Sequence, residues 1–182
     1  MTPFFKTVES SQITISELML PSHANFSGKI HGGYILSLLD QIAFACASKF
    51  SGNYCVTASV DTVNFLEPIE VGELVTMKAS VNYVGKSSMV VGIRVEAENI
   101  RTGKIKHCNS SYFTMVAKDE KGNSVSVPGL EIRSLEDVRR FYDSLTRNQD
   151  RKEREQNEAV LDYSSDEVHS EIKKYNVRLK IE

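Results

Sequence analysis

The segment HANFSGKIHGGYILSLLDQ, residues 23–41, places a glycine pair directly before a run of apolar residues that contains one aspartate. Residues 34–48 are apolar at most positions, which is typical of a helix buried nearly all round. The polar exceptions fall at roughly helical spacing and are Ser37, Asp40, Gln41 and Ser48. From its position alone, Asp40 is either a structural carboxylate bonded to a neighbouring hydroxyl or amide, or a base or nucleophile that faces a cavity.

Gly32 and Gly33 lie where this helix is expected to begin, so the first backbone N–H groups of the helix point out of its end. The absent side chains would let a ligand approach the backbone, and the partial positive charge of a helix N-terminus suits a developing oxyanion. This helix end could therefore polarise a carbonyl group, with Asp40 nearly two turns further along. For a glycine pair alone, a simple tight turn is the better explanation.

The segments 75–83 and 89–97 alternate between apolar and polar residues, which is the pattern of half-buried strands. The glycine-containing segments 84–87 and 101–104 are predicted hairpin turns. The first joins these two strands, and the second precedes the strand expected at residues 105–117. Further strands are expected at residues 11–19, 54–65 and 105–117. One long helix, at about residues 33–50, interrupts them. The sequence therefore predicts an α+β fold in which a mostly antiparallel sheet packs on one long helix.

The chain changes character near residue 129, because all ten glycines lie before residue 130 and the last 52 residues hold 24 of the 46 charged side chains. We therefore predict a packed domain over residues 1–130 and a charged extension, mostly helical or partly disordered, over residues 131–182. Ser134-Leu-Glu-Asp137 resembles a capping box at a helix start. An apolar stripe follows, formed by Val138, Phe141, Tyr142 and Leu145. We expect this stripe to pack on the domain or on a neighbouring subunit.

The composition argues against several classes of function. A net charge of −2 gives no support for binding to nucleic acid or to an anionic membrane. The three cysteines form no CxxC pair, which argues against a disulfide framework or a zinc site and suits a reducing cytosol. The N-terminus lacks a signal-peptide pattern, and no apolar run approaches the ~18 residues of a membrane span. We therefore expect a soluble, cytoplasmic protein.

The segment from Asn25 to Asp40 resembles the signature of the hotdog-fold acyl-CoA thioesterases of the acyl-CoA hydrolase family. That signature consists of an asparagine, a nearby glycine, a glycine pair and an apolar stretch that ends in aspartate. The resemblance continues through Val56-Thr-Ala-Ser-Val60, Phe65-Leu-Glu-Pro68 and Glu98-Asn-Ile-Arg-Thr-Gly103, and ends at about residue 127. Each motif alone is weak, whereas their combination in this order is specific.

This resemblance implies a hotdog fold, in which the sheet wraps around the central helix, and an active site shared between the two protomers of a dimer. It implies hydrolysis of acyl-CoA to free fatty acid and CoA by water, without a metal and with no cofactor beyond the CoA of the substrate. Asp40 of one protomer would act as general base or nucleophile, and Asn25 of the other would hold the water or the thioester. The N–H groups of Gly32 and Gly33 would receive the carbonyl oxygen.

The same resemblance places Lys86, Ser87 and Ser88 where the phosphates or the pantetheine of CoA pass, although a solvated turn explains Lys86 equally well. His31 fills a position that varies in the family, so we expect it to be a packed ring or a donor behind the site. Members of the family commonly form hexamers built as trimers of dimers. We therefore expect a homodimer as the minimal unit and a homohexamer as the assembly.

Two other functions stay open at this point. A hotdog hydratase or dehydratase relies on a histidine and an acidic residue at different helix positions, whereas here Asp40 accompanies Asn25. A non-catalytic acyl-CoA sensor usually carries a DNA-binding module, and no helix-turn-helix pattern precedes residue 11. We therefore favour an acyl-CoA thioesterase, with general-base attack and a transient anhydride on Asp40 as the two open mechanisms.

Overall fold

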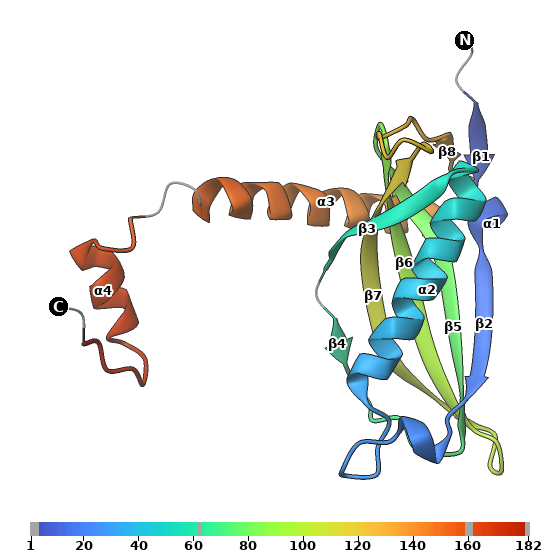
Figure 1. Cartoon of the computed structure of the whole chain (residues 1–182), viewed down its shortest axis with the longest axis horizontal. Coiled ribbons are helices and arrows are strands. Elements are labelled where there is room, and N and C mark those ends of the chain that lie inside the picture. Colours follow the sequence, from blue (N-terminus) through green and yellow to red (C-terminus); the bar gives the residue numbers. More distant parts are fainter. Residues whose placement is uncertain (1–3, 62, 159–161, 181–182) are drawn as a thin grey trace. The chain divides into compact units, whose positions relative to one another are not determined.

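The computed structural model describes residues 4–61, 63–158 and 162–180. A six-stranded sheet wraps around the long helix α2 (Gly32–Ser51), as Figure 1 shows. Its strands follow the order β2-β5-β6-β7-β3, with the short β4 beside β7, and all of these pairings are antiparallel. The strands are β2 (Ile13–Leu18), β3 (Tyr54–Val60), β4 (Asn64–Phe65), β5 (Glu73–Val84), β6 (Ser88–Asn99) and β7 (Lys104–Lys118). The predicted α+β arrangement is confirmed.

The central strands β5 and β6 carry the alternation that the sequence predicts. The side chains of Val75, Met77 and Val81 on β5 are fully buried in the cluster that packs on α2. The predicted hairpin between the two strands is present, and the Gly85 N–H donates to the Ser88 carbonyl at 2.8 Å. The period of two therefore sets the face of the sheet that receives the helix.

The strand predicted over residues 54–65 is divided into β3 and β4. The pairing of β3 with β7 shifts register between Thr57 and Ser59, and such an irregularity bends a strand away from its partner. After this bend, β4 rejoins β7, with Phe65 opposite Asn109. The division matters for function because it places β4 beside the N-terminus of α2.

The N-terminal segment contains elements that the sequence pattern did not predict. A single helical turn, α1 (Val8–Ser11), precedes the strand expected from residue 11. Thr7 caps this turn, because its side-chain oxygen accepts a hydrogen bond from the Ser10 N–H at 3.2 Å. Before it, β1 (Phe5–Thr7) pairs in parallel with β8 (Gly129–Glu131) as a separate two-stranded sheet. Strands of three residues are too short to show a period of two.

Helix α2 is buried on one face and open on the other. Its inward side chains are fully or almost fully buried, and they are those of Ile35, Leu39, Ile42, Cys46, Ala47 and Phe50. On the opposite face, Leu36, Asp40 and Phe44 are exposed in the single chain. The expectation of a helix buried nearly all round is therefore wrong for one chain, because its sheet covers only one side of the helix.

The chain divides into two compact units, Met1–Ser144 and Leu145–Glu182. Helix α3 (Leu135–Glu158) begins with the predicted reciprocal cap, in which Ser134 Oγ accepts from the Asp137 N–H at 3.1 Å and Asp137 Oδ2 accepts from the Ser134 N–H at 3.2 Å. In the first unit, the Phe141 ring lies 5.2 Å from that of Tyr83, whereas Val138 and Tyr142 are exposed. The part of the predicted stripe that belongs to the first unit is therefore only partly covered within that unit.

The second unit contains the rest of α3 and the short helix α4 (Asp166–Ile172), which Ser165 caps through the Val168 N–H at 3.4 Å. None of the helices in the described ranges combines the length and apolarity needed to cross a bilayer. The predicted boundary at residue 130 concerns independent folding and stays a prediction.

Candidate active site

Asp40 and Thr57 meet where the open face of α2 runs beside β3. The Thr57 hydroxyl donates to Asp40 Oδ1 at 2.6 Å, and both side chains are exposed in the single chain. They border a cavity of about 650 Å³. The cavity is lined by Asp40, Gln41, Phe44, Tyr54, Cys55, Val56 and Thr57. Asp40 therefore has a hydrogen-bonded carboxylate oxygen, Oδ1, and a second oxygen that stays available to a ligand.

Thr57 has no role in the sequence-based prediction of the site. Its position becomes meaningful only when the register of β3 against β7, with Thr57 opposite Met115, places it beside α2. The separation between Asp40 and Thr57 is 17 residues along the chain, so no local pattern joins them. The family resemblance of the segment from Val56 to Val60 is the one signal that could have pointed to it.

The N–H groups of Gly32 and Gly33 differ in the structure. His31 is the N-cap of α2, and its Nδ1 accepts from the Gly33 N–H at 3.0 Å. Within the described part of the chain, the Gly32 N–H makes no hydrogen bond. The helix therefore presents one free donor at its N-terminus, where the partial positive charge of the helix is concentrated. In the single chain, His31 is an exposed capping residue that accepts a hydrogen bond, and not the packed ring or donor expected for it; its noncatalytic role stays a prediction.

An aromatic ring lies close to each of the two glycines. A Cβ built on Gly33 would lie 3.1 Å from Cε1 and Nδ1 of His31. A Cβ built on Gly32 would lie 3.4 Å from Cζ of Phe65. Neither glycine has a positive φ, so no left-handed backbone conformation requires them, and only the contact at Gly33 is tighter than ordinary van der Waals contact.

Asn25 organises a tight loop that comes before α2. Its Oδ1 accepts from the Ser27 N–H at 2.9 Å, the Ser27 hydroxyl at 2.7 Å and the Lys29 N–H at 3.2 Å. Gly28, with a φ of 78°, supplies the left-handed conformation of the turn. The amide nitrogen Nδ2 makes no hydrogen bond to the residues that the structure describes. The loop thus fixes the amide plane through its oxygen and leaves the nitrogen free to donate.

The loop is joined to α2 through His23 and Tyr34. Their rings stack with centroids 3.9 Å apart, and the His31 N–H donates to the His23 carbonyl at 2.9 Å. The Tyr34 hydroxyl donates to Glu17 on β2, and this hydrogen bond raises the pKa of Tyr34. These contacts tie the Asn25 loop to the helix end that carries the free N–H.

The hairpin residues Lys86, Ser87 and Ser88 lie far from this helix end in one chain. Ser88 pairs with Val116 on β7, whereas Phe65, whose ring lies close to Gly32, pairs with Asn109. These two positions on β7 are seven residues apart, or about 24 Å at the usual rise of a strand. A single chain therefore does not bring the predicted CoA-binding residues to Gly32. It also forms no hydrogen bond between the described side chains of Asn25 and Asp40.

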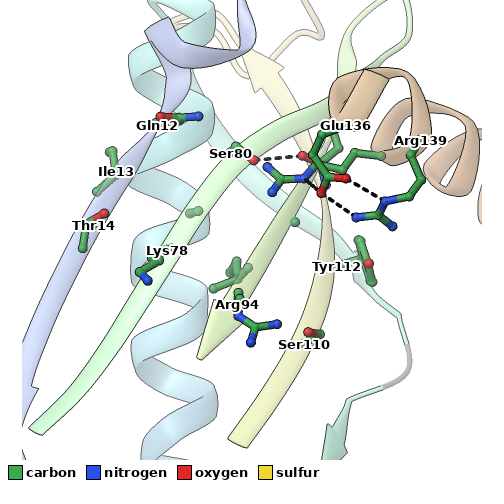
Figure 2. Close-up of a pocket in the computed structure, with 15 residues that line it drawn as sticks. Gln12, Ile13, Thr14, Lys78, Ser80, Arg94, Ser110, Tyr112, Glu136 and Arg139 are labelled. Atoms are coloured by element: carbon green, nitrogen blue, oxygen red, sulfur yellow. Dashed lines mark hydrogen bonds and ion pairs between the residues drawn. The ribbon is translucent and has the colours of Figure 1, made fainter. Parts of the chain in front are cut away.

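A second cavity, of about 350 Å³, lies on the sheet face turned away from α2 (Figure 2). Its cations are already paired: Arg139 and Arg140 contact Glu136 at 2.7 and 2.9 Å, and Lys78 and Arg94 contact Glu96 at 2.7 and 2.8 Å. The hydrogen bonds from Arg139 and Arg140 hold the pKa of Glu136 at about 2, which keeps its carboxylate charged. None of the predicted site residues lines this cavity.

Metal or thiolate chemistry finds little support in the described residues. They contain no group of three histidine, cysteine or acidic side chains placed to hold a metal ion. The three cysteines are free and buried, and burial raises the pKa of Cys46 to about 12. The groups that remain around α2 are a carboxylate, a hydroxyl, an amide and a backbone N–H, which suit water-dependent acyl transfer.

Comparison with known proteins identifies relatives over most of the chain. The model of the thioesterase superfamily matches residues 27–104. The protein VdlD of Helicobacter pylori is 43% identical over 143 residues, which are 79% of this chain and 82% of that protein. An apo-hexameric acyl-CoA thioesterase of solved structure is 34% identical and has a TM-score of 0.82, with 87% of this chain and 99% of that chain covered.

The acyl-CoA hydrolase of Staphylococcus aureus has been solved in complex with butyryl-CoA, CoA and CoA disulfide. It is 30% identical to this chain, with a TM-score of 0.79 and with 85% of this chain and 94% of that chain covered. Structures of its alanine variants replace an asparagine, an aspartate and a threonine, at positions separated by 15 and then 17 residues.

Proposed function

This chain belongs to the acyl-CoA thioester hydrolases of the thioesterase superfamily, and we propose that it hydrolyses acyl-CoA through Asp40 of one protomer and Asn25 of its partner. The observation that carries the proposal is the hydrogen bond from Thr57 to Asp40 at the edge of an open cavity. It fixes one carboxylate oxygen and leaves the other, Oδ2, for water or substrate. The products are a free fatty acid and CoA.

The spacing of the residues supports this assignment. In this chain, Asn25 precedes Asp40 by 15 positions and Asp40 precedes Thr57 by 17. The asparagine, aspartate and threonine replaced in the Staphylococcus aureus acyl-CoA hydrolase have the same separations. Agreement in residue type and in both intervals makes these three residues the best candidates for the reaction in this chain.

In the general-base route, Asp40 Oδ2 takes a proton from water while the water oxygen attacks the thioester carbonyl carbon. The carbonyl oxygen becomes an oxyanion that accepts a hydrogen bond from the Gly32 N–H. The carbon–sulfur bond then breaks, and CoA leaves as a thiolate that takes up the proton. In the second route, an Asp40 carboxylate oxygen attacks the carbonyl carbon, the carbon–sulfur bond breaks and CoA leaves as a thiolate, so that an anhydride forms. Water then opens the anhydride, which restores the Asp40 carboxylate, releases the fatty acid and supplies a proton to the thiolate. In both routes, Asn25 Nδ2 donates to the water or to the substrate.

A second protomer completes the site in this proposal. The exposed Leu36 and Phe44 on either side of Asp40 form an apolar face that a second copy of α2 would cover. An antiparallel arrangement would bring the partner's Asn25 loop, and its hairpin from Lys86 to Ser88, toward this face. Three of the solved relatives are described as hexameric thioesterases. We propose a homohexamer built as a trimer of dimers, in the cytoplasm.

The proposal is tested by following thiol release from acyl-CoAs of short to long chain with the wild type and Asp40→Asn. The wild type should release CoA, and Asp40→Asn should lower the rate by roughly two orders of magnitude or more with its melting temperature unchanged. Asp150→Asn makes the same chemical change on the exposed surface of α3 and serves as the control. Tight binding of acyl-CoA without any release by the wild type would favour the sensor instead.

A further inference from the structure

The short strand β4 carries an aromatic ring close to Gly32, whose N–H makes no hydrogen bond within the described part of the chain. Phe65 pairs with Asn109 of β7, and its Cζ would be in van der Waals contact, at 3.4 Å, with a Cβ built on Gly32. Its exposed fraction is 50%, so about half of the side chain is open to solvent in the single chain. The Phe65 ring therefore lies close to the backbone of Gly32.

A buried amide holds β4 in this place. Asn109 is fully buried, its Nδ2 donates to the Asn64 carbonyl at 2.9 Å, and its Oδ1 accepts from the hydroxyl of the fully buried Ser111. The Leu66 N–H donates to the Cys108 carbonyl at 2.9 Å on the other side of Phe65. Hydrogen bonds to β7 at Asn64 and at Leu66, on either side of Phe65, thus hold this strand of two residues in place. Buried hydrogen bonds of this kind are costly to break.

We propose that Phe65 is a positioning residue for thioester hydrolysis, because its ring shields the Gly32 N–H from water and confines that donor to the substrate carbonyl. A hydrogen bond to a developing oxyanion is stronger where water is excluded. The open side of the ring forms a wall for the acyl carbonyl as it reaches the helix end. This inference rests on the proposed function, since it assigns Phe65 to the same donor.

The test compares Phe65→Ala, Phe65→Leu and Leu66→Ala in the full-length protein. Leu66 neighbours Phe65 on the chain and has a similar exposed fraction, 57%, so Leu66→Ala is a matched control for loss of apolar surface. We measure kcat and KM with the acyl-CoA that the wild type hydrolyses fastest, together with the melting temperature. Because Phe65 is half-exposed, its substitution does not open a cavity in the core.

Phe65→Ala should lower kcat about tenfold and leave KM within about twofold, because the oxyanion interaction exists only in the transition state. Phe65→Leu should recover most of the rate, and Leu66→Ala should match the wild type. The inference is overturned if Phe65→Ala has the same kcat and KM as Leu66→Ala. It is also overturned if Phe65→Ala lowers kcat/KM only by raising KM, with kcat unchanged. In those cases, release by the wild type and its loss in Asp40→Asn still support the proposed function. An inactive wild type would overturn both proposals.

Discussion

The Thr57 hydroxyl donates a 2.6 Å hydrogen bond to Oδ1 of Asp40, and this bond joins β3 to the open face of α2. It limits the rotation of the Asp40 carboxylate, which lines the cavity. In our account the bond orients the reacting group and does not itself take part in bond making.

Replacing Thr57 by valine keeps the shape of the side chain and removes the donor. We expect Thr57→Val to lower kcat about tenfold or more, because Asp40 loses the bond that orients it. Thr57→Ser keeps the hydroxyl and should retain most of the activity. Steady-state kinetics with one acyl-CoA measure both variants. Equal kcat values for Thr57→Val and wild type would remove Thr57 from the site.

His31 caps α2 through the Gly33 N–H, so His31→Ala should destabilise the fold. The loss of an N-cap costs about 1 kcal/mol in the free energy of unfolding, which urea titration measures. His31→Asn introduces another good N-cap residue and should recover most of that stability. An unfolding free energy for His31→Ala equal to that of the wild type would show that the cap contributes nothing.

The C-terminal region should be separable at residue 144 rather than at residue 130. A chain ending at Ser144 retains the cap of α3 and the contact between Phe141 and Tyr83. We expect its melting temperature and thioesterase rate to match those of the full chain. A chain ending at Glu131 loses both contacts and should be less stable by about 2 kcal/mol. Gel filtration of both chains shows whether assembly needs the removed residues.

Equal free energies of unfolding for the chains ending at Ser144 and at Glu131 would contradict a boundary at residue 144. In that case, the packing of Phe141 on Tyr83 would contribute nothing, and the prediction of an independent domain over residues 1–130 would be supported. Phe141→Ala in the chain ending at Ser144 separates the ring contact from the helix cap.

The buried cysteines should be inert in the folded protein. A pKa of about 12 leaves roughly one Cys46 thiol in ten thousand ionised at about pH 8, and burial also raises the pKa of Cys108. Burial raises this pKa and so keeps the Cys46 thiol in its neutral form, and raising the pH toward 12 should increase the reactivity of Cys46. A thiol reagent should therefore label the cysteines at about pH 8 only after denaturation. Rapid labelling of the native protein would contradict this burial.

The fold was predictable to the extent that it rests on repeating local patterns. The period of two in β5 and β6, and the apolar run of α2, each extend over many residues and survive small errors in the boundaries. The strands β1 and β8 have three residues each and carry no period. The open face of α2 was not predictable either, because an apolar helix has the same sequence whether its own sheet or a second chain covers it.

The part of the candidate site that lies in one contiguous motif could be predicted from the sequence. Asp40 and Asn25 stand in one segment, whereas Thr57 and Phe65 come close to α2 only through the pairing of β3 and β4 with β7. The two glycines were predicted as equivalent donors. The capping bond from the Gly33 N–H to His31 distinguishes them, and it depends on the rotamer of a side chain that sequence does not reveal.

The central claim, that Asp40 of one protomer and Asn25 of its partner act on one thioester, is tested most directly by mixing two inactive variants. Asn25→Ala and Asp40→Asn are purified separately, mixed in equal amounts and allowed to exchange subunits, which co-purification of a tagged chain confirms. Each hybrid dimer then holds one intact site, so random exchange should restore about a quarter of the wild-type rate. A rate that stays at the sum of the two variants would show that each chain carries a complete site of its own.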